Sequence, residues 1–97
     1  MAKALALFPG TVTGTLTALN SMNVSNIVRL GTGTYTVGLT TGMSSTAWYP
    51  IAQAHDTVNI GCTAFMMDAT SCIVRTFNTD NTAYDPPFVK FIAYGDQ

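Results

Sequence analysis

Hydrophobic residues occur along this chain in short runs that Gly, Asn, Asp and Pro interrupt. No window of helical length has apolar residues at i, i+3, i+4 and i+7, and the runs are rich in Thr, Val, Ile and aromatic residues. Short runs of this composition between turn residues predict β-strands. We expect seven strands, at residues 11–18, 24–30, 34–40, 48–54, 58–67, 72–77 and 88–94.

Seven short strands without helices predict an all-β fold, an antiparallel β-sandwich of jelly-roll-like type. The 97 residues suit a single domain, and no repeat, linker or low-complexity tract marks a boundary within them. We expect residues 1–20 to form an N-terminal arm and the first strand, and residues 21–97 to form the body of the sandwich.

Two closely spaced glycines lie in the stretch RLGTGTYTVGLTTGM, residues 29–43. A dinucleotide-binding loop needs a third glycine where Thr36 stands, followed by a helix start, whereas YTVGLT alternates as a strand does. A glycine in the left-handed region often ends a three-residue hairpin loop, which fits Gly33. We therefore expect a hairpin around residues 31–33 that pairs Ile27 with Val37, Ser25 with Leu39 and Arg29 with Tyr35.

Two of the predicted strands carry apolar residues on both faces. A strand with one wet face should alternate between apolar and polar residues, and strands 24–30 and 88–94 do not. A chain of this length has little material to cover a strand twice, so a neighbouring subunit is the economical source of the second cover. The candidate subunit interface therefore consists of Val24, Val28, Leu30, Phe88 and Ile92.

Charged residues make up only 9% of the chain, with four basic residues and five acidic residues that are all Asp. Soluble domains usually have about 25%, and here sixteen Thr residues, with Ser and Asn, supply the polarity. Such a surface suits a protein packed against neighbours, although an uncharged soluble domain has the same composition. The cations are scattered, which argues against nucleic acid as a partner.

The N-terminal apolar run ends at Pro9-Gly10. It is shorter than the apolar region of a signal peptide and much shorter than a membrane helix. We therefore expect no membrane insertion, and synthesis that leaves the product in a cytoplasm.

Triad chemistry has a single candidate pair, His55-Asp56. A triad also needs a positioned nucleophile and an oxyanion hole. Ser44, Ser45 and Ser71 lie in turn-like segments without a nucleophile-elbow motif. We expect AHDTVN to be a solvated turn and the protein not to be an enzyme, with a small hydrolase as the remote alternative.

The two cysteines, Cys62 and Cys72, are too few for a secreted disulfide scaffold. A hairpin around DATS places Met67 opposite Cys72 and Cys62 near Phe77, which keeps the sulfurs too far apart to bond. We expect free, mostly buried thiols, while a different register would join them. One His and two thiols ten residues apart do not supply a zinc site at a known spacing.

The polar segment NTDNTAYDPP offers oxygen ligands that calcium prefers, but it lacks the glycine and the terminal glutamate of an EF-hand. Asn and Asp also favour plain turns, because they hydrogen-bond their own backbone. We expect a loop here, and no metal or cofactor in the protein. The residues that calcium would need are Asn78, Asp80, Asn81 and Asp85.

Three aromatic residues lie nearest the predicted turns: Trp48, Tyr49 and Tyr84. Exposed aromatic rings stack on sugars or anchor protein interfaces. These three are therefore the candidate contacts with a ligand or partner. The alternative is that they plug the end of the core.

Two segments carry motifs of a known kind. In MNVSNIVRLGTGTYTVGLTTGM, residues 22–43, an Asn-Val-Ser-x-Ile segment leads into a Gly-Thr-Gly turn and then into Tyr-Thr-Val-x-x-Thr. In CIVRTFNTDNTAYDPPFVKFIAYG, residues 72–95, a Val-Arg-Thr strand, a polar loop and a short apolar last strand follow one another. Both segments resemble a module of tail fibres and other virion proteins of tailed bacteriophages. Residues 47–68 match it only in rhythm, so the resemblance covers about half of the chain.

The resemblance implies a β-sandwich that assembles as a homotrimer on the virion exterior, often at the receptor-facing end of a fibre, and it implies no reaction. In fibres the module usually closes a long chain, whereas no shaft precedes it here. We expect a virion structural protein of tail-fibre or receptor-binding type, made in the host cytoplasm. Its expected partners are copies of itself, capsid or tail and baseplate proteins, and a host surface glycan as a further candidate. The alternative is a capsid decoration protein that stabilises the head and docks through residues 4–18.

Overall fold

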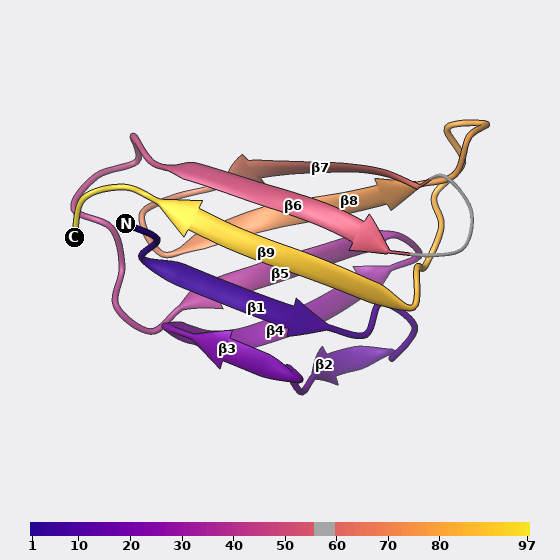
Figure 1. Ribbon diagram of the computed structural model, residues 1–97, viewed down its shortest axis with the longest axis horizontal. Helices are drawn as coiled ribbons and strands as arrows, with labels where there is room; N and C mark the ends of the chain where they lie inside the picture. The colour runs from indigo at the N-terminus through magenta and orange to yellow at the C-terminus, as the bar shows by residue number, and fades with distance from the viewer. Residues whose placement is uncertain (56–59) are drawn as a thin grey trace.

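The computed structural model describes residues 1–55 and 60–97. These residues form nine strands in two antiparallel sheets that lie face to face (Figure 1), which confirms the predicted all-β class. Sheet A has the strand order β3-β1-β9-β6, and sheet B has the order β2-β4-β5-β8-β7. The strands are β1 (Ala4–Phe8), β2 (Gly14–Leu16), β3 (Asn20–Met22), β4 (Val24–Gly31), β5 (Thr34–Leu39), β6 (Tyr49–His55), β7 (Gly61–Met66), β8 (Ser71–Phe77) and β9 (Phe88–Tyr94).

The predicted strand at 88–94 has the observed bounds of β9, and the predictions at 24–30, 34–40, 48–54 and 72–77 correspond to β4, β5, β6 and β8 with shifted ends. The prediction at 58–67 corresponds to β7, and its residues 58 and 59 lie outside the described residues. The prediction at 11–18 is wrong over most of its length, because β2 covers only Gly14–Leu16. The predicted number of strands is too low, because β1 and β3 lie outside all seven predicted strands. Among the residues described, no helix is long and apolar enough to cross a membrane.

Strand β1 corrects the expectation of an N-terminal arm. It pairs with β3 on one side and with β9 on the other, so it is an inner strand of sheet A. Ala4, Ala6 and Phe8 alternate with Leu5 and Leu7, and the first three are buried between the sheets. A five-residue run with this period of two suits a strand, and Pro9, which has no N–H to donate, ends it. Residues 4–8 therefore belong to the body of the fold.

The β4–β5 hairpin has two of the three predicted pairs, Ile27 with Val37 and Arg29 with Tyr35. The pair of Ser25 with Leu39 is wrong, because the register shifts between Val24 and Asn26 and brings Val24 opposite Leu39. A bulge of this kind adds one residue to a strand, so the residues before it change faces.

The turn of the hairpin contains Gly33 in the left-handed region, with φ of 65°, as predicted. A side chain on Gly33 would also collide with the carbonyl oxygen of Thr76, so glycine is needed here for both conformation and space.

The core lies between the two sheets and takes alternate residues from the long strands. Its largest aromatic contact joins the sheets: the rings of Phe8 in β1 and Tyr35 in β5 meet edge to face, with centroids 5.5 Å apart. Trp48 is also buried, and its indole N–H donates to the carbonyl oxygen of Asp68 at 2.8 Å. Burial of each such ring stabilises the fold by about 1.5–3 kcal/mol.

Candidate functional site

The outer face of sheet A exposes several large apolar side chains. Alternate residues of β1, β3, β6 and β9 point away from the core, and the register places them in rows across the sheet. Ile51 and Tyr49 are 53% and 72% exposed, and Met22, Phe88 and Tyr94 are also exposed. The outer face of sheet A consists of Leu5, Leu7, Asn20, Met22, Tyr49, Ile51, Gln53, His55, Phe88, Lys90, Ile92 and Tyr94.

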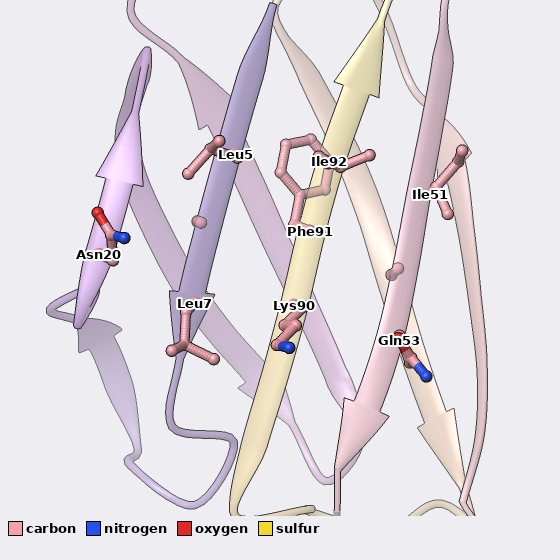
Figure 2. Close-up of a pocket in the computed structure, with 10 residues that line it drawn as sticks. Leu5, Leu7, Asn20, Ile51, Gln53, Lys90, Phe91 and Ile92 are labelled. Carbon is pink, nitrogen blue, oxygen red and sulfur yellow. The ribbon is translucent and has the colours of Figure 1, made fainter. Parts of the chain in front are cut away.

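Figure 2 shows a shallow groove of about 380 Å³ on this face. Apolar residues of β1, β6 and β9 make up most of its lining, among them Leu5, Ile51 and Ile92. Lys90 and Gln53 lie side by side on β9 and β6 in the next row, and Asn20 lies across the sheet on β3. The groove is therefore apolar along its floor and polar toward one end.

This arrangement follows from strands that are apolar at both alternate sets of positions. An antiparallel sheet with one solvated face normally carries polar residues there. In β9, buried Val89, Phe91 and Ala93 alternate with Phe88 and Ile92, so the strand can bury both sides only when something covers the outer one. The geometry of the face suits burial against another surface.

The five residues of the predicted interface do not form one surface. Phe88 and Ile92 lie on the outer face of sheet A. Val28 and Leu30 belong to β4 in sheet B, where Leu30, beside a register shift, is 62% exposed. Val24 packs against the core, because the bulge at Ser25 turns it inward. The role of the five residues in a subunit interface stays a prediction, and two of them lie on the outer face of sheet A.

Four residues of the apolar face are missing from the predicted interface: Leu5, Leu7, Met22 and Ile51. The signal for the first two is the alternation in ALALF, which fits a strand with two apolar sides. Met22 belongs to a strand of three residues, which is too short to show a period. The strand that contains Ile51 was predicted, but its own sequence does not show which side is exposed. That side follows from its pairing with β9.

The candidate aromatic contacts have different positions. Trp48 is 4% exposed, so it belongs to the core and is not available to a ligand, which corrects the prediction for this residue. Tyr49 stands directly opposite Tyr94 at the edge of the apolar face. Tyr84 is half-buried, and its backbone pairs with Thr76.

A polar cluster at one end of the molecule connects sheet B to the loop before β9. The Arg29 guanidinium forms an ion pair of 2.6 Å with Asp85, whose other oxygen accepts hydrogen bonds from the N–H of Gly33 and the hydroxyl of Tyr35. Burial opposes the charged form of Asp85, but these donors hold the pKa of its carboxyl below the usual value. Burial, and then the charge of Asp85, raise the pKa of Tyr35. The cluster holds the loop before β9 against sheet B, and its polar groups bond to one another.

The residues considered for calcium do not converge. The Asp85 carboxylate faces Arg29, and the amide oxygen of Asn78 accepts hydrogen bonds from the backbone N–H groups of Asp80 and Thr82. Asp80 and Asn81 are exposed, and Asn81 has a positive φ of 61°, as turn residues of this type often do. Across residues 1–55 and 60–97, no three His, Cys or Asp side chains group as metal ligands do.

His55 ends β6 opposite Phe88, and its Nε2 is buried without a hydrogen-bond partner among the described residues. Asp56, the second member of the proposed pair, lies outside the described residues. Ser44 and Ser45 lie in an exposed loop, and the hydroxyl of Ser71 in sheet B donates to Asp68.

The two cysteines are free thiols, as predicted, with Cys72 buried and Cys62 half-buried. Burial raises the pKa of Cys62 to about 11 and that of Cys72 to about 12, so neither is a ready nucleophile. The predicted register of their hairpin is wrong by one residue, since Met66 faces Cys72 and Gly61 faces Phe77.

A comparison with models of known families, with curated proteins and with solved structures finds no match to this chain.

Proposed function

We propose that the chain is a non-enzymatic structural protein of a bacteriophage particle, a small surface module of tail-fibre or receptor-binding type. In this proposal the two sheets form a β-sandwich that works as an assembly of identical copies, three in number as the resemblance of residues 22–43 and 72–95 implies. The observation that supports an assembly role is the apolar outer face of sheet A, which spans all four strands of that sheet.

The size of this face supports association as its role. The four strands have three, five, seven and seven residues, and at about 3.3 Å per residue and about 4.8 Å between strands they give a face of ~350 Å². At roughly 25 cal/mol per Å², covering it contributes at most about 9 kcal/mol before the costs of association, which are estimated at about 4–15 kcal/mol. The gain is comparable with the cost, so a neighbour that covers this face can be held stably but reversibly.

The proposal is tested by locating the protein on intact particles with a labelled antibody, and by measuring the molar mass of the purified protein with light scattering. We expect label on the particle exterior and a mass of three chains, or of six chains where two trimers pair. A protein that is absent from particles, and monomeric at high micromolar concentration, would contradict the proposal.

Capsid decoration is the second candidate, and the same apolar face favours it because an exposed apolar face suits attachment to a shell. This role now depends on the outer face of sheet A, since residues 4–8 are an inner strand and not a free arm. The two roles differ in their partner. A decoration protein binds bare capsids and raises their heat resistance, whereas a fibre-type module binds host cells or their glycans and leaves capsid stability unchanged.

A further inference from the structure

We infer that the outer face of sheet A is the surface on which a second copy of this chain stacks, with a two-fold axis lying in the interface. The inference rests on the proposed function for self-association, and it adds which face makes the contact and in what orientation. It follows from the order of the rows that the register creates on this face.

Three successive rows cross the sheet. The apolar row lies in the middle and consists of Met22, Leu5, Ile92 and Ile51. On one side of it the lysine row includes Lys90, directly opposite Gln53. On the other side the tyrosine row includes Tyr94, directly opposite Tyr49. Polar and aromatic groups thus flank the apolar row on opposite sides.

A two-fold axis along the apolar row brings these complementary rows together. Rotation about it turns one sheet over onto another, keeps each strand above the same strand of the second copy, and reverses the strand direction. The apolar row then meets itself, and the lysine row of each copy meets the tyrosine row of the other. Lys90 faces Tyr94, where an ammonium group can lie on an aromatic ring, and Gln53 faces the hydroxyl of Tyr49.

Twisted sheets that stack face to face cross at about 30°. The strands of the two copies therefore lie most directly above one another near the centre of the face, on β9, and diverge toward its edges.

Charge favours a second copy in this orientation over other covers. Within residues 1–55 and 60–97, the outer face of sheet A has no carboxylate, and Lys90 is the charged group that the paired strands place in its three rows. Lys3 and Asp96 lie only at the margin, around the hollow beside Tyr49 and Tyr94. A threefold axis would place three Lys90 side chains at one height, where like charges repel. A foreign partner would need to bring its own acceptor for Lys90, whereas a second copy supplies the tyrosine row.

The area of the outer face of sheet A sets the expected affinity between the two copies. The face of ~350 Å² is within the range of the largest apolar patches on monomers, about 300–600 Å², and a little under half of what each partner gives to a standard interface, about 800 Å². We therefore expect a pair that dissociates in the micromolar range. A two-fold contact closes a pair, so an assembly that contains it has an even number of copies, such as two, or six where a homotrimer forms through other surfaces.

The orientation is tested by cross-linking two single variants, Lys90→Cys and Tyr94→Cys, with a short bifunctional maleimide. We expect a covalent pair when the two variants are mixed. When either variant is treated alone, the yield of the covalent pair should be less than about a tenth of the yield from the mixture. Ile92→Cys, which lies on the axis, should cross-link with itself. The unchanged chain is the control, since Cys72 is buried and Cys62 is half-buried on the inner side of β7.

The outcomes separate the inference from the proposed function. A product from Lys90→Cys alone, at the yield of the mixture, would show copies of the lysine row meeting one another and would overturn the two-fold contact. Absence of any product from the mixture at high micromolar concentration would also overturn it. In either case antibody label on particles leaves the proposed function standing, while its absence removes the proposed function as well.

Discussion

The two sheets of this protein bury similar inner faces and present different outer faces. The central row of sheet A is apolar on every strand, whereas the row that crosses sheet B contains two threonines beside three apolar residues: Thr15, Val28, Thr36, Ile73 and Phe65. Threonine is branched at Cβ and favours strands as valine does, yet it carries a hydroxyl that water can solvate. Sheet B therefore has a face that suits solvent, and sheet A has a face that suits a neighbour.

Sheet B has an exposed aromatic residue, Phe65, that a cation of the same sheet covers in part. The guanidinium of Arg75 lies over the ring of Phe65, 5.3 Å from its centroid, which is a cation–π contact. Lys90 has no such contact within the described chain, and the tyrosines of its own face lie two rows away. The difference shows that strand-forming pattern alone does not decide which face of a sheet meets water; the polarity of the outward residues does.

The largest expected effect is a difference in the free energy of unfolding between a substitution on the inner side of β1 and one on its outer side. Phe8→Ala should lower the free energy of unfolding by about 3–5 kcal/mol, because it opens a cavity beside Tyr35. Leu7→Ala, the next residue on the outer side, should cost less than about 1 kcal/mol in the monomer. Urea unfolding of both variants at low protein concentration measures the difference. Equal costs would mean that the outer side is already covered in the single chain.

A smaller effect is expected at the polar cluster that anchors sheet B. Asp85→Ala leaves Arg29 and the N–H of Gly33 without their carboxylate, which should cost about 2 kcal/mol. Asp80→Ala, in the same loop but exposed, is the matched control and should change the free energy of unfolding by less than about 0.5 kcal/mol. If chemical denaturation finds the two variants alike, the cluster does not anchor the loop.

Acid should weaken the fold through sheet B and leave the face of sheet A unchanged. The pKa of Asp85 is lower in the folded protein, so its contribution is present above the ordinary carboxyl value, about 3.9, and is lost as the pH falls through the folded value. Hydrogen bonds from Thr70 and Ser71 lower the pKa of Asp68 in the same direction.

Thermal melting at pH 7 and pH 3 should show a loss of stability that is smaller in Asp85→Ala. A loss of the same size in that variant would assign the acid sensitivity to other groups.

The sequence predicted the fold class and the hairpin, because these depend on local alternation and on turn residues. Strand β9, between Pro87 and Gly95, has clear signals at both ends and was predicted with its observed bounds. The bulge at Ser25 has no such signal, since Val24 turns inward only to meet the register of β5. The burial of Trp48 likewise depends on the distant carbonyl of Asp68.

The sequence predicts a need for a second cover, but only two of the five candidate interface residues lie on the outer face of sheet A. Phe88 and Ile92 were recognised because β9 shows its period over seven residues. Leu5 and Leu7 were not, because a five-residue run before Pro9 was interpreted as an arm. Which strands lie next to β9 in sheet A is a matter of long-range pairing, and that pairing decides which apolar residues share a face.

The outer face of sheet A is tested most directly by one matched comparison of molar mass. Ile92→Asp and Ile73→Asp place the same charge on half-buried, outward-facing isoleucines of inner strands, one in sheet A and one in sheet B. Light scattering across micromolar concentrations should show the same number of copies for the unchanged chain and for Ile73→Asp, and half that number for Ile92→Asp. Single chains for all three proteins, or a mass of Ile92→Asp equal to that of the unchanged chain, would contradict the assignment of this face to assembly.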